Sequence, residues 1–142
     1  MIQRGDIEAI VTWVPAGSKV LDLGCGNGDL LVRLSQEKHV NGLGVDIDPA
    51  NIVAAVQKGL CVIQQDIEDG LANFEDTHFD VVIFAYSLQV LERPHAVLER
   101  IVRIGKEAII TFPNFGHWRS RLSLLFSGRM PKTKALPYSW FD

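Results

Sequence analysis

The hydrophobic positions of the chain follow two alternating patterns. Short, continuous apolar runs predict a buried β-strand over residues 19–23 and further strands over 40–46, 61–66, 80–85 and 107–112. Before and between these strands, apolar residues stand three and four positions apart, which predicts helices over 6–14, 49–59 and 93–105. A further helix is predicted to follow the glycines after the first strand and to extend through Leu34. Apolar strands that alternate with helices are typical of a parallel sheet covered on both faces. The pattern therefore predicts an α/β fold with a three-layer, doubly wound, mostly parallel sheet.

Several residues fix the expected helix boundaries and buried faces. Asp6 is expected to cap the first helix, and Asp48 is expected to cap or turn the chain before Pro49, the first residue of another helix. The last helix is expected to bury an apolar stripe made of Val97, Leu98, Ile101, Val102 and Ile104.

The stretch "VLDLGCGNGDLL", residues 20–31, departs from these patterns. Asp22 interrupts an apolar strand, and Gly24, Gly26 and Gly28 follow at every second position. Glycine inside a regular element costs roughly 0.5–1 kcal/mol, so three in five residues should serve a purpose. The usual purpose is close approach of the backbone to a ligand, and ligands of such sheets bind beyond the carboxyl ends of the strands.

Two nucleotide-binding motifs fit the loop poorly. A phosphate-binding P-loop needs Gly-Lys-Ser/Thr at the start of its helix, whereas Gly28 is followed by Asp29. A dinucleotide-binding loop has the spacing G-x-G-x-x-G, whereas the spacing here is G-x-G-x-G. The carboxylate of Asp22 would also face the pyrophosphate of a dinucleotide.

S-adenosylmethionine fits better, because it has an ammonium, a sulfonium and a ribose diol but no phosphate. Asp22 can accept from its cationic part, and Asp46, twenty residues beyond the loop, has the spacing of a ribose-binding acid. Ile47 can pack on the adenine, with Asp66 and Ile67 beside the adenine amino group and ring. A single strand-end Asp is more commonly a cap, but three at successive strand ends beside G-x-G-x-G favour this cofactor.

These same residues carry a family resemblance. The runs "VLDLGCGNG", "GVDID", "QQDI" and "FDVVIFAYSLQVL" resemble class I S-adenosylmethionine-dependent methyltransferases over about residues 15–114. With "ITFPNFGHWRSRL" and "SGRMPKTKALPYSWFD", the chain looks like the methionine biosynthesis protein W (MetW) family. The resemblance implies cofactor contacts from these positions: Asp22, Gly24, Cys25, Gly26, Gly28, Asp46, Ile47, Asp66, Ile67, Ala85 and Tyr86.

The resemblance also implies a role and a partner. Its family is associated with homoserine O-acyltransferase in methionine synthesis, so we expect either a small-molecule methyltransferase or a cofactor-sensing subunit that activates the acyltransferase. Tyr86, Gln89, His95 and His117 are the polar candidates near the strand ends, and none is assigned as a catalytic base.

The resemblance further implies two more strands than the pattern predicts. Class I methyltransferases normally have seven strands, so we expect a core over residues 1–114 and a C-terminal segment over 115–142 that is truncated before the last two strands. That segment carries five basic residues against one acid and is rich in aromatic residues. It is interpreted as a lid, a partner surface or ordinary packing, and nucleic-acid binding is disfavoured because five charges are few.

Composition limits the setting of the protein. No apolar run approaches the ~20 residues that span a bilayer, and the first residues lack the pattern of a secretory signal. Cys25 and Cys61 have neither metal-ligand spacing nor a disulfide framework. We therefore expect a cytoplasmic protein with no structural metal.

Overall fold

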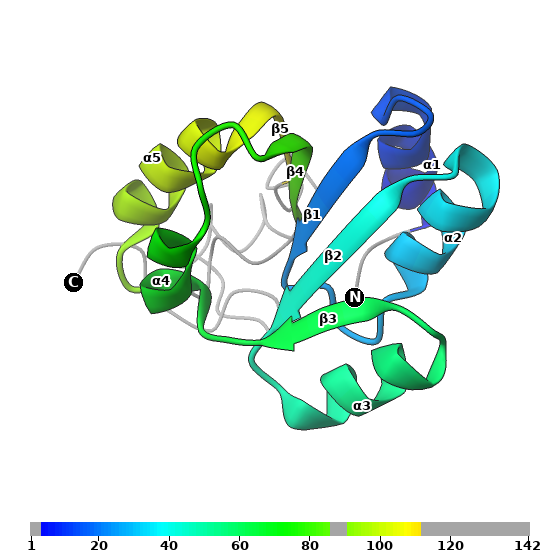
Figure 1. The fold of residues 1–142 in the computed structure, drawn as a ribbon, viewed down its shortest axis with the longest axis horizontal. Coiled ribbons are helices and arrows are strands. Elements are labelled where there is room, and N and C mark those ends of the chain that lie inside the picture. The colour runs from blue at the N-terminus through cyan, green and yellow to red at the C-terminus, as the bar shows by residue number, and fades with distance from the viewer. Residues whose placement is uncertain (1–3, 86–90, 112–142) are drawn as a thin grey trace, which may run out of the picture.

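The computed structural model describes residues 4–85 and 91–111 of the chain. Within these ranges the chain forms one five-stranded sheet with helices on both sides (Figure 1). The strands are β1 (Lys19–Leu23), β2 (Asn41–Asp46), β3 (Cys61–Gln64), β4 (Phe79–Ala85) and β5 (Gly105–Thr111). The helices are α1 (Arg4–Trp13), α2 (Asp29–Lys38), α3 (Pro49–Gln57), α4 (Ile67–Gly70), the short 3-10 helix η1 (Leu71–Asn73) and α5 (Pro94–Ile104).

The strands lie in the order β3-β2-β1-β4-β5, and all four neighbouring pairs are parallel. The chain runs outward from β1 to β3 and then crosses back to place β4 on the other side of β1. The order of the strands therefore reverses between β1 and β4, and their carboxyl ends meet at the point where sheets of this kind bind ligands.

Two hydrophobic clusters lie on the two faces of the sheet. One joins apolar side chains of α1 and α2 to Val20, Val81 and Ile83 of the central strands. The other joins η1 and α5 to Leu21, Val82 and Phe84 of the same strands. In Figure 1, α1 and α2 lie on one side of the sheet, and α4 and α5 lie on the other. The predicted α/β, doubly wound fold is confirmed.

Details of the predicted elements differ from the structure. The first helix begins at Arg4, so Asp6 lies inside it and is not its N-cap. Asp48 does cap α3, because its Oδ1 accepts from the backbone N–H of Ala50 at 2.9 Å. Val102 is 65% exposed, because the buried face of α5 is made by Val97, Ile101 and Ile104.

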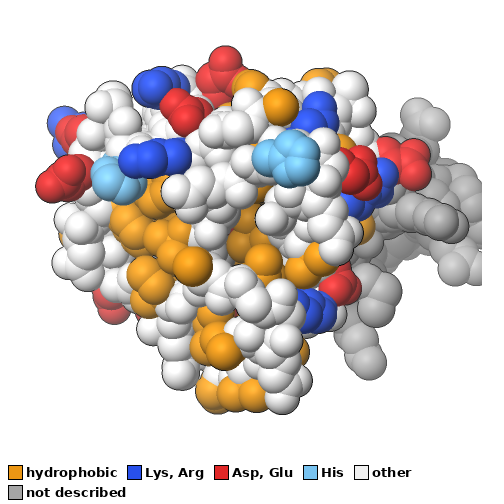
Figure 2. Space-filling model, turned by 45° about the vertical axis from the view of Figure 1, so that its right-hand side comes forward, with side chains coloured by type: hydrophobic (Ala, Val, Ile, Leu, Met, Phe, Trp, Pro, Cys, Tyr) orange, Lys and Arg blue, Asp and Glu red, His pale blue; other side chains and the backbone are white. Residues whose placement is uncertain are grey.

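The surface is mixed in character. The face drawn in Figure 2 gathers most of its charged and histidine side chains in its upper half, whereas hydrophobic side chains extend down to α3, the lowest element of Figure 1. Val53 and Val56 of α3 are among the large apolar side chains that are exposed. Within the described residues, no helix is long and apolar enough to span a bilayer. The predicted boundary at residue 114 and the segment 115–142 lie outside these residues.

Candidate functional site

The carboxyl ends of the strands bring most of the predicted site residues to one edge of the sheet. Leu23, the last residue of β1, pairs with Val45 of β2 and with Phe84 of β4. The next residue of each chain segment is Gly24, Asp46 and Ala85, respectively. The backbone N–H groups of Gly24 and Cys25 both donate to the carbonyl of Val45, at 2.8 and 3.0 Å. The glycine loop thus starts as a continuation of the β1–β2 pairing.

The glycines of the loop adopt backbone conformations that other residues rarely adopt. Gly24, Gly26 and Gly28 have φ angles of 73°, 55° and 79°. A Cβ on Gly26 would meet nothing within 4 Å, whereas a Cβ on Gly28 would lie 2.2 Å from Cδ1 of Leu60. Gly26 therefore leaves open space next to the backbone, and Gly28 allows close packing at the start of α2.

A lysine from the far end of α3 holds the other end of the loop. Lys58 Nζ donates to the carbonyl of Asn27 at 2.8 Å and to Asp29 Oδ1 at 2.6 Å. The side chain of Asn27 also donates to Asp29 Oδ2 at 3.0 Å. These contacts, with Lys58 foremost, lower the pKa of Asp29 and keep its carboxylate charged at the N-terminus of α2.

Asp46 is the better anchored of the two buried acids. Its Oδ2 accepts from the N–H of Gly26 at 2.8 Å, and its Oδ1 accepts from the N–H of Asp48 at 2.9 Å and from Asn51 Nδ2 at 3.2 Å. A carboxylate has about four lone-pair positions, so these three donors leave room for one more. Asp46 thereby connects the glycine loop to the start of α3.

Asp22 has the opposite environment. It is 2% exposed, and its Oδ2 has no hydrogen-bond partner among the residues that the structure describes. Burial, and to a smaller extent the neighbouring Asp46, raises the pKa of Asp22 to about 7. Burial and the same two acids raise the pKa of the Cys25 thiol to about 12, so Cys25 is protonated at neutral pH and is a poor nucleophile.

The remaining predicted residues lie at or just after the ends of β2, β3 and β4. Ile47 is 63% exposed directly after Asp46, and Ala85 is buried at the end of β4. Asp66 is exposed and caps α4, with its Oδ1 accepting from the N–H of Glu68 at 2.9 Å. Ile67 packs against the second hydrophobic cluster.

Some candidates lie elsewhere. Tyr86, Gln89 and His117 fall outside the described residues, and His95 is exposed in the first turn of α5. The described residues contain no group of three His, Cys, Asp or Glu side chains that would hold a metal ion. Sequence reasoning missed Asn51 and Lys58. Asn51 bonds to Asp46, and Lys58 bonds to Asn27 and Asp29, and these contacts form only when the chain is folded.

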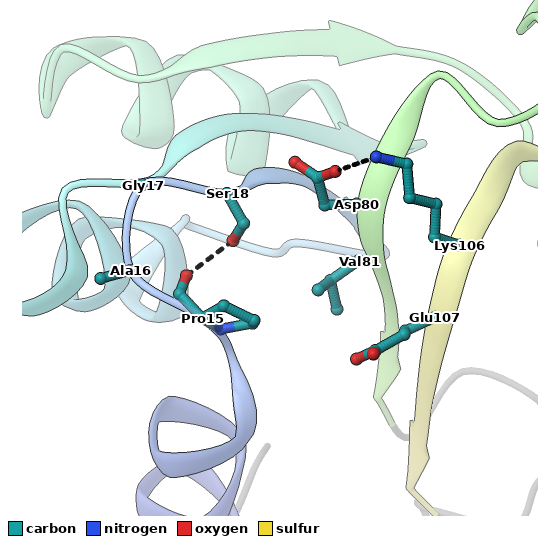
Figure 3. Close-up of a pocket in the computed structure, with 8 residues that line it drawn as sticks. All are labelled: Pro15, Ala16, Gly17, Ser18, Asp80, Val81, Lys106 and Glu107. Atoms are coloured by element: carbon teal, nitrogen blue, oxygen red, sulfur yellow. Dashed lines mark hydrogen bonds and ion pairs between the residues drawn. The ribbon is translucent and has the colours of Figure 1, made fainter.

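A hollow lies at the opposite edge of the sheet, where the strands begin. It has a volume of about 380 Å³ and lies where β1, β4 and β5 begin. Its walls include the turn of residues 15–18, in which Ser18 Oγ donates to the carbonyl of Pro15, and the Asp80–Lys106 ion pair at 2.7 Å (Figure 3). None of the predicted cofactor residues lines it.

The fold is shared with known methyltransferases. A TehB-like S-adenosylmethionine-dependent methyltransferase from Corynebacterium glutamicum is 28% identical, with a TM-score of 0.66, over 76% of this chain and 61% of that chain. An S-adenosylmethionine-dependent methyltransferase from Thermotoga maritima has a TM-score of 0.68 over 83% of this chain and 55% of that one. At 19% identity, the second likeness shows the fold alone.

A closer relative comes from methionine biosynthesis. The bifunctional methionine biosynthesis protein MetXA/MetW of Rhodopirellula baltica is 39% identical over 146 residues, which cover 96% of this chain. The chain spans 23% of the length of that relative. The family described as methionine biosynthesis protein MetW matches residues 4–142. The resemblance carried by the sequence motifs is thereby confirmed, and the chain belongs to the MetW family.

Proposed function

We propose that the carboxyl edge of the sheet binds S-adenosylmethionine and that the chain acts in methionine biosynthesis. The observation that carries the proposal is the buried pair Asp22 and Asp46 beside the open backbone of Gly26. In the described part of the chain, every ion pair formed by a lysine or arginine involves an acid other than these two. A ligand that carries its own positive charge would supply the cation that this pair of acids lacks.

The residues present fit the parts of this cofactor. Asp22 would face its cationic amino-acid portion, and the loop backbone around Gly26 would lie against that portion. Asp46 would accept from the ribose hydroxyls, with Ile47 against the adenine and with Asp66 and Ile67 near its edge. Ala85 and Tyr86, where β4 ends, would contact the methionine end.

The hydrogen bonds that Asp46 already accepts limit how many ribose hydroxyls it can bind. Its single remaining lone-pair position can accept from one hydroxyl only. Acceptance from both hydroxyls requires one donor to leave. Asn51 is the candidate, because its 3.2 Å bond is the longest of the three and its side chain can rotate without moving the backbone.

The bound cofactor supplies an activated methyl group. Two roles follow from the proposed binding: transfer of that methyl group to a small acceptor, or sensing of the cofactor by a subunit that regulates homoserine O-acyltransferase. The second role is supported by the Rhodopirellula baltica relative, in which MetXA and MetW form one bifunctional protein. Product analysis with labelled methyl donor, with and without the acyltransferase, separates the two roles.

Binding itself is tested by titration calorimetry. S-adenosylmethionine and S-adenosylhomocysteine should bind, and NAD should not. Asp46→Ala removes a charge-assisted hydrogen bond of about 1.5–3 kcal/mol, so affinity should fall at least tenfold. Asp80→Ala, which removes an acid at the opposite edge, is the matched control. Unchanged affinity in Asp46→Ala would remove this residue from the ribose site.

A further inference from the structure

Asp22 and Asp46 lie on the same face of the sheet, on adjacent strands. Asp22 pairs with Gly44, and Asp46 follows Gly44 by two residues on β2, so both side chains project to the same side. A Cβ at position 44 would lie 2.7 Å from Cys25 Sγ and 3.0 Å from Leu31 Cδ1, so Gly44 leaves room for the thiol on this face of the sheet. Beyond the larger effect of burial, the charge of Asp46 is close enough to Asp22 to raise the pKa of its carboxyl group.

The two acids differ in what stabilises their charge. Three N–H donors point at Asp46, and a carboxylate accepts such bonds better than a carboxylic acid does. Asp22 Oδ2 is buried and has no donor among the described residues. When two neighbouring buried carboxyl groups share one proton, the proton resides on an oxygen that no donor stabilises. Within the described residues, Asp22 Oδ2 is such an oxygen.

No other described group near the pair changes this assignment. The Cys25 thiol, on the loop, stays protonated because its pKa is raised to about 12. The residue of β4 that pairs with Asp22 is Ile83, and α2 presents Leu31 toward Gly44. Lys58 is already bound to Asp29 and Asn27. The pKa of Asp22, raised to about 7 by burial first and Asp46 second, agrees with a proton held near neutral pH.

We infer that Asp22 selects cationic ligands by proton exchange. In the free chain near neutral pH, Asp22 holds a proton in part of the molecules. When a ligand brings an ammonium or sulfonium group to the site, Asp22 releases its proton to solvent, and the resulting carboxylate pairs with the positive group. The inference rests on the proposed function and adds to it a rule of selection: an analogue without the positive group binds without releasing a proton.

Calorimetry in two buffers measures the released proton directly. S-adenosylhomocysteine, which carries an ammonium group, and methylthioadenosine, which does not, are each titrated at pH 7 in phosphate and in Tris, whose heats of protonation differ. With a pKa of Asp22 of about 7, S-adenosylhomocysteine should release about half a proton per site, and methylthioadenosine should release none. Asp22→Asn should abolish the release, and Asp80→Asn should retain it.

The outcomes separate the inference from the proposed function. Binding of S-adenosylhomocysteine with equal heats in both buffers overturns the proton exchange and leaves the cofactor assignment intact. Failure of both ligands to bind overturns the cofactor assignment and the exchange together. Carboxyl-carbon NMR of the free wild-type chain supplies a measurement that needs neither ligand nor variant. An Asp signal that titrates near neutral pH supports the inference, and titration of every Asp below pH 5 overturns it.

Discussion

The ammonium of Lys58 donates to the carbonyl of Asn27 across thirty-one residues of sequence, at 2.8 Å. This contact joins the C-cap of α3 to the glycine loop, and the same ammonium neutralises Asp29 at the start of α2. The amides of Gly24, Cys25 and Gly26 donate to Val45 and Asp46 of β2, which holds the first half of the loop. Lys58 supplies a bond from outside the loop and so fixes the position of Asn27.

Removal of this bond should loosen the loop more than the fold. For Lys58→Met we expect a several-fold weaker affinity for S-adenosylhomocysteine and faster hydrogen exchange at residues 26–29. The free energy of unfolding should change by less than about 1 kcal/mol, since partly exposed ion pairs contribute little. Lys106→Met, which breaks the exposed pair with Asp80 at the opposite edge, is the control and should leave affinity unchanged. Equal affinity in the two variants would contradict the positioning role of Lys58.

Gly28 and Gly59 offer a matched pair of substitutions. Both have φ near 79°, so alanine at either position should lower the free energy of unfolding by roughly 1–2 kcal/mol because of the left-handed backbone. Only at Gly28 does the new methyl group also meet Leu60 at 2.2 Å and Ala55 at 3.3 Å. We expect Gly28→Ala to lower the free energy of unfolding by about 1–3 kcal/mol more than Gly59→Ala does, as measured by urea denaturation. Equal losses would show that Leu60 yields to the methyl group without cost.

Stability should depend on pH through Asp22. The pKa of its carboxyl group is about 7 in the folded chain and about 4 when unfolded, so between these values the folded state binds the extra proton. The free energy of unfolding therefore rises as pH falls from 7 toward 4, by at most about 4 kcal/mol from this group. Above pH 7 the folded chain carries the unfavourable charge.

Asp22→Asn tests this dependence. The variant should be more stable than the wild type at pH 8, and the difference should shrink at pH 5, where the wild-type carboxyl group is also neutral. Denaturation curves at the two pH values measure the difference. A stability gap that is the same at pH 5 and pH 8 would argue against the raised pKa.

Arg100 is expected to be the main polar anchor of α5. Its guanidinium donates to the carbonyls of Leu71 and Phe74 and to Asp76 Oδ1, and thereby holds η1 and the segment after it against the helix. Arg100→Met should lower the free energy of unfolding by about 1–3 kcal/mol, because hydrogen bonds to charged groups are lost and two carbonyls lose their donor. Arg93→Met removes a far more exposed arginine and should cost less than about 1 kcal/mol. Similar denaturation midpoints for the two variants would refute the anchoring role.

The strands and the glycine loop could be predicted because their signals are local. The apolar runs of the central strands β1 and β4 belong to strands buried on both faces, whereas the outer strands β3 and β5 are largely exposed. Asp22 was recognisable as the one charged residue inside a buried run. The error at Val102 has a physical cause. Ile101 and Ile104 already fill the face of α5 that meets the sheet, and a residue adjacent to Ile101 points about 100° away from it.

Other features depend on contacts that a pattern does not contain. The short elements α4 and η1 span only four and three residues, too few for a period to show. The three hydrogen bonds that Asp46 accepts come from donors on the loop, on the following turn and on α3, which only the folded chain brings together. The same holds for the burial of Asp22 Oδ2, which meets no donor in the part of the chain that the structure describes.

The shared acceptor at Val45 has a consequence for how the loop behaves as a whole. Because the amides of Gly24 and Cys25 both end on a carbonyl of the inner strand β2, the first half of the loop can open only when the β1–β2 ladder opens. These two amides therefore belong to the most cooperative folding unit of the domain and should exchange with solvent as slowly as the strands themselves. The backbone of this half of the loop is therefore already ordered before a ligand binds. Ordering the loop should cost little of the binding free energy.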